Sequence, residues 1–496
     1  MTKESGNNTI QTFWVLIGSL SAFAFTIVSS MLLSRYFNKS DYGTYKQVMY
    51  VYNTLLIVFT LGLPRAYSYF LPRVSEGEAK DLISKLNYVL LGMGLIMTSC
   101  FFFGSNVIAD ILKNKELGLS LKYFALVPLF MLPTMGVDGI LATYKQTKFL
   151  AIYKTLTQIF MLCAVTLPVI LFSGTVNTAI LGFTVASFLS FLLALFFKYK
   201  PIKEFKREKS SISYKDIFNY TLPIMGATLW GIVISSSDQF FISRYFGNNV
   251  FADFANGSLE LPFVGMIIAS TTTVLSPVFS KYVFDKGIES KNEVLLLWKS
   301  TLSKTVKIIY PLVVFCFCFS TSIMTILYGE KYFNSGIYFQ IKLIVNFFTV
   351  ITYGPLLLSI GGQKFYFNVH MYGAFLLVGL EWLIVVYTDS PYLITVTSVF
   401  CQITRIICML FFISTYFKIK LFDLFPIKLV LNIIVPSLIV LYALKYLSFN
   451  ILFFNNIESI LFSFVIYILF FSFWVYYKKI DYLSILKPIY NNFIKQ

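Results

Sequence analysis

The sequence contains a single histidine, His370, and it has no nucleotide-binding glycine loop followed by Lys-Ser or Lys-Thr. One imidazole excludes a histidine-rich metal centre, and the missing glycine loop argues against ATP-driven work. We expect His370 to be a surface or interfacial residue. Cysteine is also scarce. The six cysteines lie within long apolar stretches, so no disulfide framework is expected; they are residues 100, 163, 316, 318, 401 and 408.

Charge is the next scarcity, because only 13% of the 496 residues are charged while 57% are hydrophobic. About twenty apolar residues carry an α-helix across a hydrocarbon core of roughly 30 Å. Continuously apolar stretches of this length exclude barrel strands, which alternate over about ten residues. We therefore expect an all-α polytopic membrane protein with about 14 transmembrane helices. The predicted spans are 13–33, 47–64, 86–103, 119–141, 155–172, 178–197, 218–243, 254–275, 305–327, 343–360, 365–386, 392–415, 427–447 and 459–477.

The basic residues are distributed unevenly between the two sides of these spans. Of 40 Lys and Arg residues, 28 fall on the side of the N-terminus and 10 on the other side. The positive-inside rule then places both termini in the cytoplasm. The net charge of +17 comes largely from juxtamembrane loops such as Lys198 to Lys215. Positive-inside topology and anionic lipid headgroups explain these charges, so no nucleic-acid partner is expected.

A short repeat divides the chain. Ser34-Arg35-Tyr36-Phe37 ends the first span, and Ser243-Arg244-Tyr245-Phe246 ends the seventh span 209 residues later. The repeat predicts two six-helix lobes, 1–215 and 216–418, joined by the basic loop 198–217. Spans thirteen and fourteen form a third part, 419–496, that ends in an amphipathic tail, Lys478 to Gln496, expected at the cytoplasmic interface.

Several motifs in the first lobe carry a resemblance to a known family. Between Leu33 and Arg73 they are Ser34-Arg35-Tyr36, Asp41-Tyr42-Gly43-Thr44-Tyr45, Leu61-Gly62-Leu63 and Phe70-Leu71-Pro72-Arg73, and Leu327-Tyr328-Gly329-Glu330-Lys331-Tyr332 follows the ninth span. This pattern resembles the Wzx-type polysaccharide flippases for O-antigen or teichoic acid, of the multidrug, oligosaccharidyl-lipid and polysaccharide (MOP) exporter superfamily. The resemblance implies a MATE-like fold, a location in the bacterial cytoplasmic (inner) membrane, and a lipid-linked oligosaccharide as cargo. It also implies polysaccharide polymerases or glycosyltransferases as partners.

Ionisable residues inside predicted spans are costly and often functional. Asp238 shares a helical face with Thr228, Gly231 and Ser235, which suggests a polar cavity wall or a cation site. An alternative role for Asp238 is a packing contact with another helix. No cofactor is expected. Two driving forces stay open: a Na⁺ or H⁺ gradient coupled at Asp238, with Glu381 as a partner suggested by the resemblance, or removal of the product on the outer side.

The basic residues are candidates for binding a pyrophosphate-bearing substrate. Arg405 lies well inside the twelfth span, and its guanidinium fork matches phosphate oxygens; an internal salt bridge to Asp238 or Glu381 is the alternative. Other basic residues lie at span ends that the resemblance places beside the space between the lobes. Each alone is explained by snorkelling to headgroups, and together they would make a cationic cavity. They are Arg35, Arg65, Arg73, Lys145, Arg244 and Lys281.

Three functions remain open from the sequence. The first is a flippase that moves an undecaprenyl-pyrophosphate-linked oligosaccharide from the cytoplasmic to the periplasmic leaflet by alternating access, without acting as an enzyme. The second is a cation-coupled multidrug exporter of the same fold, although residues 13–33 lack the carboxylate expected of one. The third is a membrane polymerase or glycosyltransferase, although its large periplasmic loop is missing. A basic cavity favours the anionic lipid-linked sugar over a cationic drug.

Overall fold

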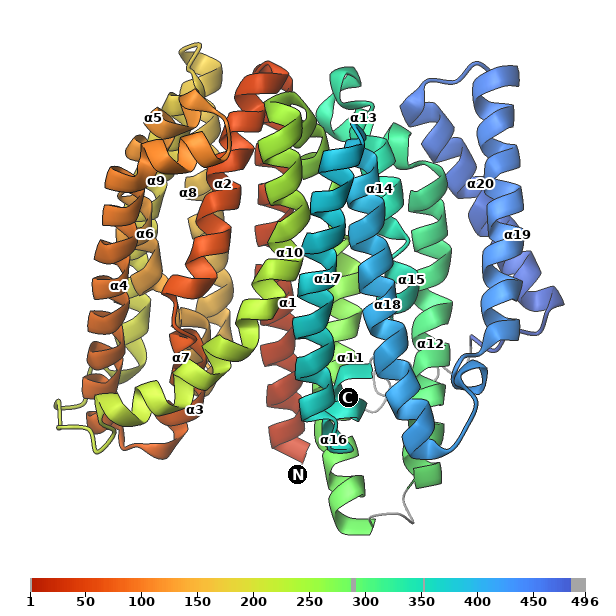
Figure 1. Ribbon diagram of the computed structural model, residues 1–496. Helices are drawn as coiled ribbons and strands as arrows, with labels where there is room; N and C mark the ends of the chain where they lie inside the picture. Colours follow the sequence, from red (N-terminus) through yellow and green to blue (C-terminus); the bar gives the residue numbers. More distant parts are fainter. Residues whose placement is uncertain (1, 287–290, 351–352, 483–496) are drawn as a thin grey trace. The chain divides into compact units, whose positions relative to one another are not determined.

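The computed structural model describes residues 2–286, 291–350 and 353–482, and these residues form helices joined by short connections (Figure 1). Contacts divide the chain into two compact units, Met1–Ala252 and Asp253–Gln496. The first unit contains α1 Thr2–Tyr36, α2 Lys39–Phe59, α3 Leu63–Phe70, η1 Leu71–Arg73, α4 Glu76–Ile111, α5 Lys115–Phe124, α6 Val127–Met131, η2 Leu132–Thr134, α7 Val137–Thr143, α8 Thr147–Leu171, α9 Val176–Tyr199, η3 Lys200–Ile202 and most of α10 Tyr214–Gly257.

The second unit begins within the last turns of α10. Its helices are α11 Pro262–Lys286, α12 Lys291–Cys318, α13 Ser320–Tyr328, η5 Glu330–Tyr332, α14 Ser335–Leu343, α15 Asn346–Thr349, α16 Tyr353–Ser359, α17 Gln363–Tyr387, α18 Pro391–Phe417, η6 Leu421–Leu424, α19 Ile427–Tyr446, the π-helical turn η7 Leu447–Ile451 and α20 Asn456–Tyr477.

Each of the fourteen predicted spans overlaps a helix of the described chain. Ten of the described helical segments are long and apolar enough to cross a membrane, or up to 13 if each bent pair of helices counts as one span. A shorter apolar helix, Pro262–Thr272, lies where the eighth span was predicted. The prediction of an all-α, multi-span membrane protein is therefore confirmed.

Two predicted spans are broken by proline and glycine. The span 119–141 consists of α5, α6, η2 and α7, with Pro128 and Pro133 near the start of new helical pieces and Gly136 at a φ of 90° before α7. Proline removes a backbone donor and ends the preceding helix. A second break separates α2 from α3 with a bend of 46°, and Gly62 adopts a φ of 71° there. Glycine reaches this left-handed region without steric cost.

The division into lobes 1–215 and 216–418 and a third part 419–496 stays a prediction. The contact boundary, between Ala252 and Asp253, falls near the end of α10 and not in the basic loop 198–217. The predicted tail is described only as far as Tyr482, so most of it lies outside the described residues.

In the first unit, α8 packs against both α1 and α9. The contact of α8 with α9 is closest at Gly182, where an added Cβ would lie 1.9 Å from the backbone oxygen of Ala164. Small residues at such crossings let two membrane helices approach until their backbones touch. The second unit is centred on the fully buried Trp298 of α12, which packs in a cluster with Phe279 of α11 and Ile413 of α18.

Replacing Gly182 with Ala should force α8 and α9 apart and reduce stability by about 1–3 kcal/mol, the usual cost of overpacking. The measurement is the thermal unfolding midpoint of the purified protein in detergent. Gly92→Ala is the matched control, because an added Cβ at Gly92 meets no heavy atom within 4 Å. Equal midpoints for the two variants would contradict the close approach at Gly182.

Candidate substrate-binding site and buried polar contacts

Arg405 of α18 is a buried cation in the middle of a membrane helix. It lies 14 residues after the start of α18 and 12 before its end, or about 21 Å and 18 Å along the axis. The side chain is only 9% exposed. Its Nε donates a hydrogen bond of 3.4 Å to the backbone oxygen of Cys401, one turn earlier. Within the described residues of the second unit, Arg405 forms no salt bridge, and the internal ion pair with Asp238 or Glu381 stays the alternative prediction.

Two tyrosines and a histidine from two other helices lie near this guanidinium. Tyr353 of α16 and Tyr366 of α17 lie within electrostatic range of Arg405. The His370 ring lies over Tyr366 with ring centres 4.2 Å apart. Nδ1 of His370 is 2.9 Å from the backbone oxygen of Tyr366, and since a carbonyl only accepts, this nitrogen carries the proton. His370 is therefore a half-buried neighbour of Arg405, and its predicted place at the surface or the membrane interface stays a prediction.

Gly373 of α17 provides the space that Arg405 occupies. An added Cβ at Gly373 would lie 2.4 Å from Cδ of Arg405. The arginine stem thus rests directly on the backbone of α17. Two turns further along α17, the fully buried Glu381 lies within electrostatic range of Cys401. The second unit therefore carries two of the predicted site residues, Glu381 and Arg405, on the neighbouring helices α17 and α18, about two helical turns apart.

Asp238 belongs to α10 in the first unit and is 2% exposed. One of its carboxylate oxygens accepts from the backbone N–H of Gln239 at 2.9 Å. Gly231 and Ser235, which share its helical face, are exposed. The predicted polar face is thus exposed along part of its length and ends at a buried carboxylate. Among the described residues, no three His, Cys, Asp or Glu side chains gather as a metal site.

The predicted basic residues of the first unit fall into two groups at opposite ends of its helices. Arg35 ends α1 and Arg65 begins α3, so the 21 residues of α2, about 32 Å, lie between them. Arg244 belongs with Arg35, because its neighbour Ser243 contacts the first half of α2. Lys145 belongs with Arg65, since it follows α7, which packs on α3. The side chain of Lys281 lies outside the described part.

Two of these basic side chains have specific partners within the first unit. The Arg73 guanidinium lies 3.6 Å from the ring centre of Tyr69, which itself stacks on Tyr220 of α10 at 3.9 Å. Cation–π contacts of this kind hold arginine on an aromatic face. Arg244 donates a hydrogen bond to the backbone oxygen of Ile111, at the end of α4. These contacts tie α10 to α3 and α4.

Lys198 was predicted to begin the basic loop, and this prediction is wrong. Lys198 lies in the last turn of α9 and is fully buried. Its ammonium group donates to the Tyr67 hydroxyl at 3.2 Å, to Oδ1 of Asn87 at 2.7 Å and to the backbone oxygen of Pro133 at 2.7 Å. All three donors of the lysine are thereby used. One cation joins α3, α4, η2 and α9.

A second buried network connects α2, α5 and α10. Gln47 donates to the Ser243 hydroxyl at 2.8 Å, and Asn114, the N-cap of α5, donates to Gln47 at 2.5 Å and to Thr44 at 3.0 Å. Asn248 of α10 also donates to Thr44, at 3.2 Å. Two members of this network belong to motifs of the sequence, Ser243 to the repeat and Thr44 to the segment Asp41-Tyr42-Gly43-Thr44-Tyr45. Gln47, Asn114 and Asn248 are neutral and belong to no motif, so the sequence did not predict their part in it.

The basic loop after α9 is docked onto the first turns of α4. Arg207 donates to Asp81 through Nε at 3.1 Å and Nη2 at 2.8 Å, and the Asp81 hydrogen bond raises the pKa of Arg207. The Lys85 ammonium lies 3.0 Å from the same carboxylate. Glu78 accepts from the backbone N–H of Ser211 at 2.8 Å. The loop is therefore held by specific polar contacts in addition to any attraction to lipid headgroups.

Replacing Lys198 with Met should destabilise the first unit, because it removes the donor to the buried Pro133 oxygen, while the Tyr67 hydroxyl still donates to Oδ1 of Asn87 at 2.9 Å. Each buried group left unsatisfied costs about 1–3 kcal/mol. The midpoint of thermal unfolding in detergent measures the effect. Lys203→Met is the control, since Lys203 is exposed and its side chain lies outside this network. A Lys198→Met protein as stable as the control would show that the buried ammonium is dispensable.

Three solved structures are similar to this chain along most of its length. The chain is similar to the structure described as lipid II flippase MurJ in an inward closed conformation, with 18% identity and a TM-score of 0.71, covering 94% of this chain and 99% of that one. A MOP superfamily transporter from Pyrococcus furiosus is similar with 14% identity and a TM-score of 0.57, covering 82% and 94%. The Vibrio cholerae MATE transporter VcmN in the bent form gives 12% identity, a TM-score of 0.56 and coverage of 86% and 99%.

These identities establish a shared fold, and the predicted MATE-like architecture of the MOP superfamily is confirmed. A sequence search of curated proteins finds no match. A family model described as polysaccharide biosynthesis protein matches residues 32–336. Because this match spans more than half of the 496 residues, the chain belongs to the polysaccharide biosynthesis protein family, with the fold of the MOP transporters.

Proposed function

We propose that this protein is a flippase that moves an undecaprenyl-pyrophosphate-linked oligosaccharide from the cytoplasmic to the periplasmic leaflet by alternating access. The chain works in a bacterial inner membrane with both termini cytoplasmic, and it makes and breaks no covalent bond. Glycosyltransferases supply the lipid-linked repeat unit, and a polymerase consumes it. Membership of the polysaccharide biosynthesis family and a fold shared with a protein described as a lipid II flippase support this proposal.

The buried Arg405 is the observation that carries the proposal. A cation held at mid-membrane without a carboxylate partner among the described residues favours an anionic ligand. A guanidinium keeps its charge and presents parallel N–H donors to two phosphate oxygens. The neighbouring Tyr353 and Tyr366 add hydroxyl donors and ring faces on which a sugar can rest. A cationic drug would be repelled by Arg405, which separates this function from multidrug export.

The other site residues enter the proposal with smaller roles. Arg35 and Arg244 would attract the pyrophosphate at one end of the first unit, and Arg65, Arg73 and Lys145 at its other end; Lys281 of the second unit is a further candidate. Because the two groups lie at different ends, they suit successive stages of passage better than one binding pocket. Coupling of transport to Na⁺ or H⁺ at Asp238, with Glu381 as a second carboxylate, stays a prediction.

Replacing Arg405 with Ala should reduce translocation by about tenfold or more, since hydrogen bonds to charged groups contribute roughly 1.5–3 kcal/mol. Arg405→Lys should retain part of the activity, because it keeps the charge and loses the fork. The measurement is surface glycan, labelled on cells that carry only the variant gene, with membrane abundance quantified by immunoblot. Lys420→Ala, an exposed cation of the same unit, is the control. Normal glycan in the Arg405→Ala cells at normal abundance would refute the assignment.

Gly373→Ala should also impair translocation, because its new methyl group displaces the Arg405 side chain without removing any charge. Gly379→Ala, on the same helix, is the matched control, since an added Cβ there meets no heavy atom within 4 Å. The same glycan assay measures both variants. We expect less surface glycan for Gly373→Ala than for Gly379→Ala at equal abundance. Indistinguishable glycan levels would mean that the placement of Arg405 on α17 is unimportant.

A further inference from the structure

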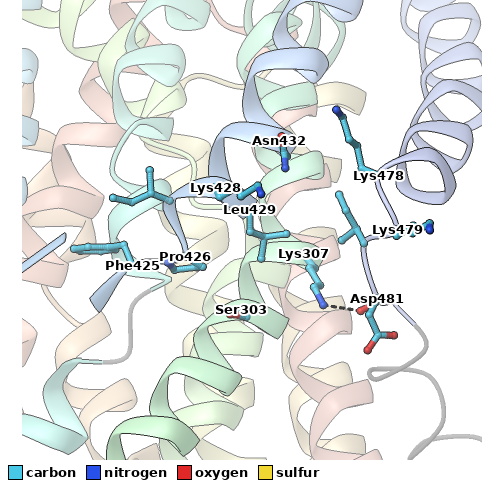
Figure 2. A pocket seen from close by; sticks show the side chains of 12 residues that line it. Ser303, Lys307, Phe425, Pro426, Lys428, Leu429, Asn432, Lys478, Lys479 and Asp481 are labelled. Atoms are coloured by element: carbon cyan, nitrogen blue, oxygen red, sulfur yellow. Dashed lines mark hydrogen bonds between the residues drawn. The ribbon is translucent and has the colours of Figure 1, made fainter. Parts of the chain in front are cut away.

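The second unit contains an open pocket of about 650 Å³ between α12, the start of α19 and the end of α20 (Figure 2). Four lysines line it: Lys307, Lys428, Lys478 and Lys479. Figure 2 shows Lys478 and Lys479 leaving the end of α20, Lys428 and Asn432 on α19, and Lys307 on α12. The four lysines come from three separate parts of the chain. None of them belongs to the substrate site described above. The volume suits a ligand of small-molecule size.

The pocket lies at the level where three membrane spans begin or end. From Lys307 to Tyr328, 22 residues contain no further charge, which is one bilayer thickness. In α19, the uncharged stretch begins after Lys428 and ends before Lys445, and α20 ends at Tyr477, immediately before Lys478. The apolar parts of all three spans therefore stop at these lysines. Ammonium groups at this level sit at the height of lipid phosphates.

Hydrogen bonds around the pocket connect α12, α19 and the end of α20. The Lys307 ammonium donates to the backbone oxygen of Asp481 at 2.5 Å, and the Tyr482 hydroxyl donates to the backbone oxygen of Lys307 at 2.7 Å. The Trp474 indole N–H donates to the backbone oxygen of Asn432 at 2.8 Å, joining α20 to α19. Lys428 and Lys479 are exposed. Their ammonium groups are available to a ligand that enters from the open side.

The lining combines the two chemistries of a phospholipid. Lysine ammonium groups and the Asn432 amide are donors for phosphate oxygens, whereas Phe425, Leu429 and Ile480 offer apolar surface to the start of acyl chains. Basic pockets between membrane helices bind anionic headgroups in this way. We propose that this pocket binds the phosphate of an anionic phospholipid headgroup from the surrounding bilayer. The ligand joins α12, α19 and α20 at one membrane surface, and this role is independent of the proposed transport function.

The test is binding of dioctanoyl phosphatidylglycerol to the purified full-length protein in detergent, followed by native mass spectrometry. Replacing Lys307, Lys428, Lys478 and Lys479 together with Gln should weaken binding by about tenfold or more, because the charge attraction at the headgroup is lost. The matched control is Lys203, Lys206 and Lys209 together replaced with Gln, which removes exposed lysines of the first unit. We expect wild-type affinity for this control. Equal weakening in both variants would overturn the proposal.

Three further ligands separate the possible sources of phosphate, and a second variant guards against misfolding. Dioctanoyl phosphatidylcholine should bind at least about tenfold more weakly than the anionic lipid, because its choline is repelled by the lysines. Inorganic phosphate should compete poorly, and farnesyl pyrophosphate should not bind better than the anionic phospholipid. Success of either competitor would assign the pocket to a free anion or to the transported substrate, and would refute our proposal. Lys428→Gln with Lys479→Gln, both exposed, provides a second variant that keeps the Lys307 contact; unchanged affinity in this variant would also refute it.

Discussion

A polar or ionisable group away from water must be held by hydrogen bonds or by opposite charge, and this requirement organises the interior of the chain. Lys198 satisfies it with three oxygens from three helical elements, so a single side chain fixes their separation. Arg405 satisfies it only in part, because Nε bonds a backbone oxygen of its own helix. The first arrangement is complete and structural. The second leaves hydrogen-bonding capacity, which is the property that a binding site needs.

The sequence predicted the spans well because the bilayer imposes a length and a composition on each of them. It predicted the breaks less well. Pro128, Pro133 and Gly136 divide one apolar stretch into four helical pieces, and hydropathy is insensitive to such division. Lys198 was missed for a related reason. It follows the last apolar residues of its span, so composition alone assigns it to the loop. Its burial depends on packing against Tyr67 and Asn87, which belong to other helices.

The candidate site was predictable only in its charged members. Arg405 and Glu381 stand out in a sequence because charge is rare inside a span. Tyr353 and Tyr366 do not, since the sequence contains 33 tyrosines and aromatic belts explain most of them, and the single histidine His370 was assigned no part in the site. Their proximity to Arg405 depends on how α16, α17 and α18 pack. The same holds for Gly373. This glycine matters because the Arg405 side chain packs against it, and not because of a local turn.

The docked loop after α9 has a consequence for biosynthesis. Asp81 and Glu78 lie in the first turns of α4, but their partners Arg207 and Ser211 are made more than 120 residues later. A nascent chain that has released only α4 therefore carries these carboxylates without their contacts. The first unit acquires these contacts only after the loop that follows α9 has left the ribosome, and the contacts of α10 with α2 and α4 form later still, so its assembly is completed late during membrane insertion.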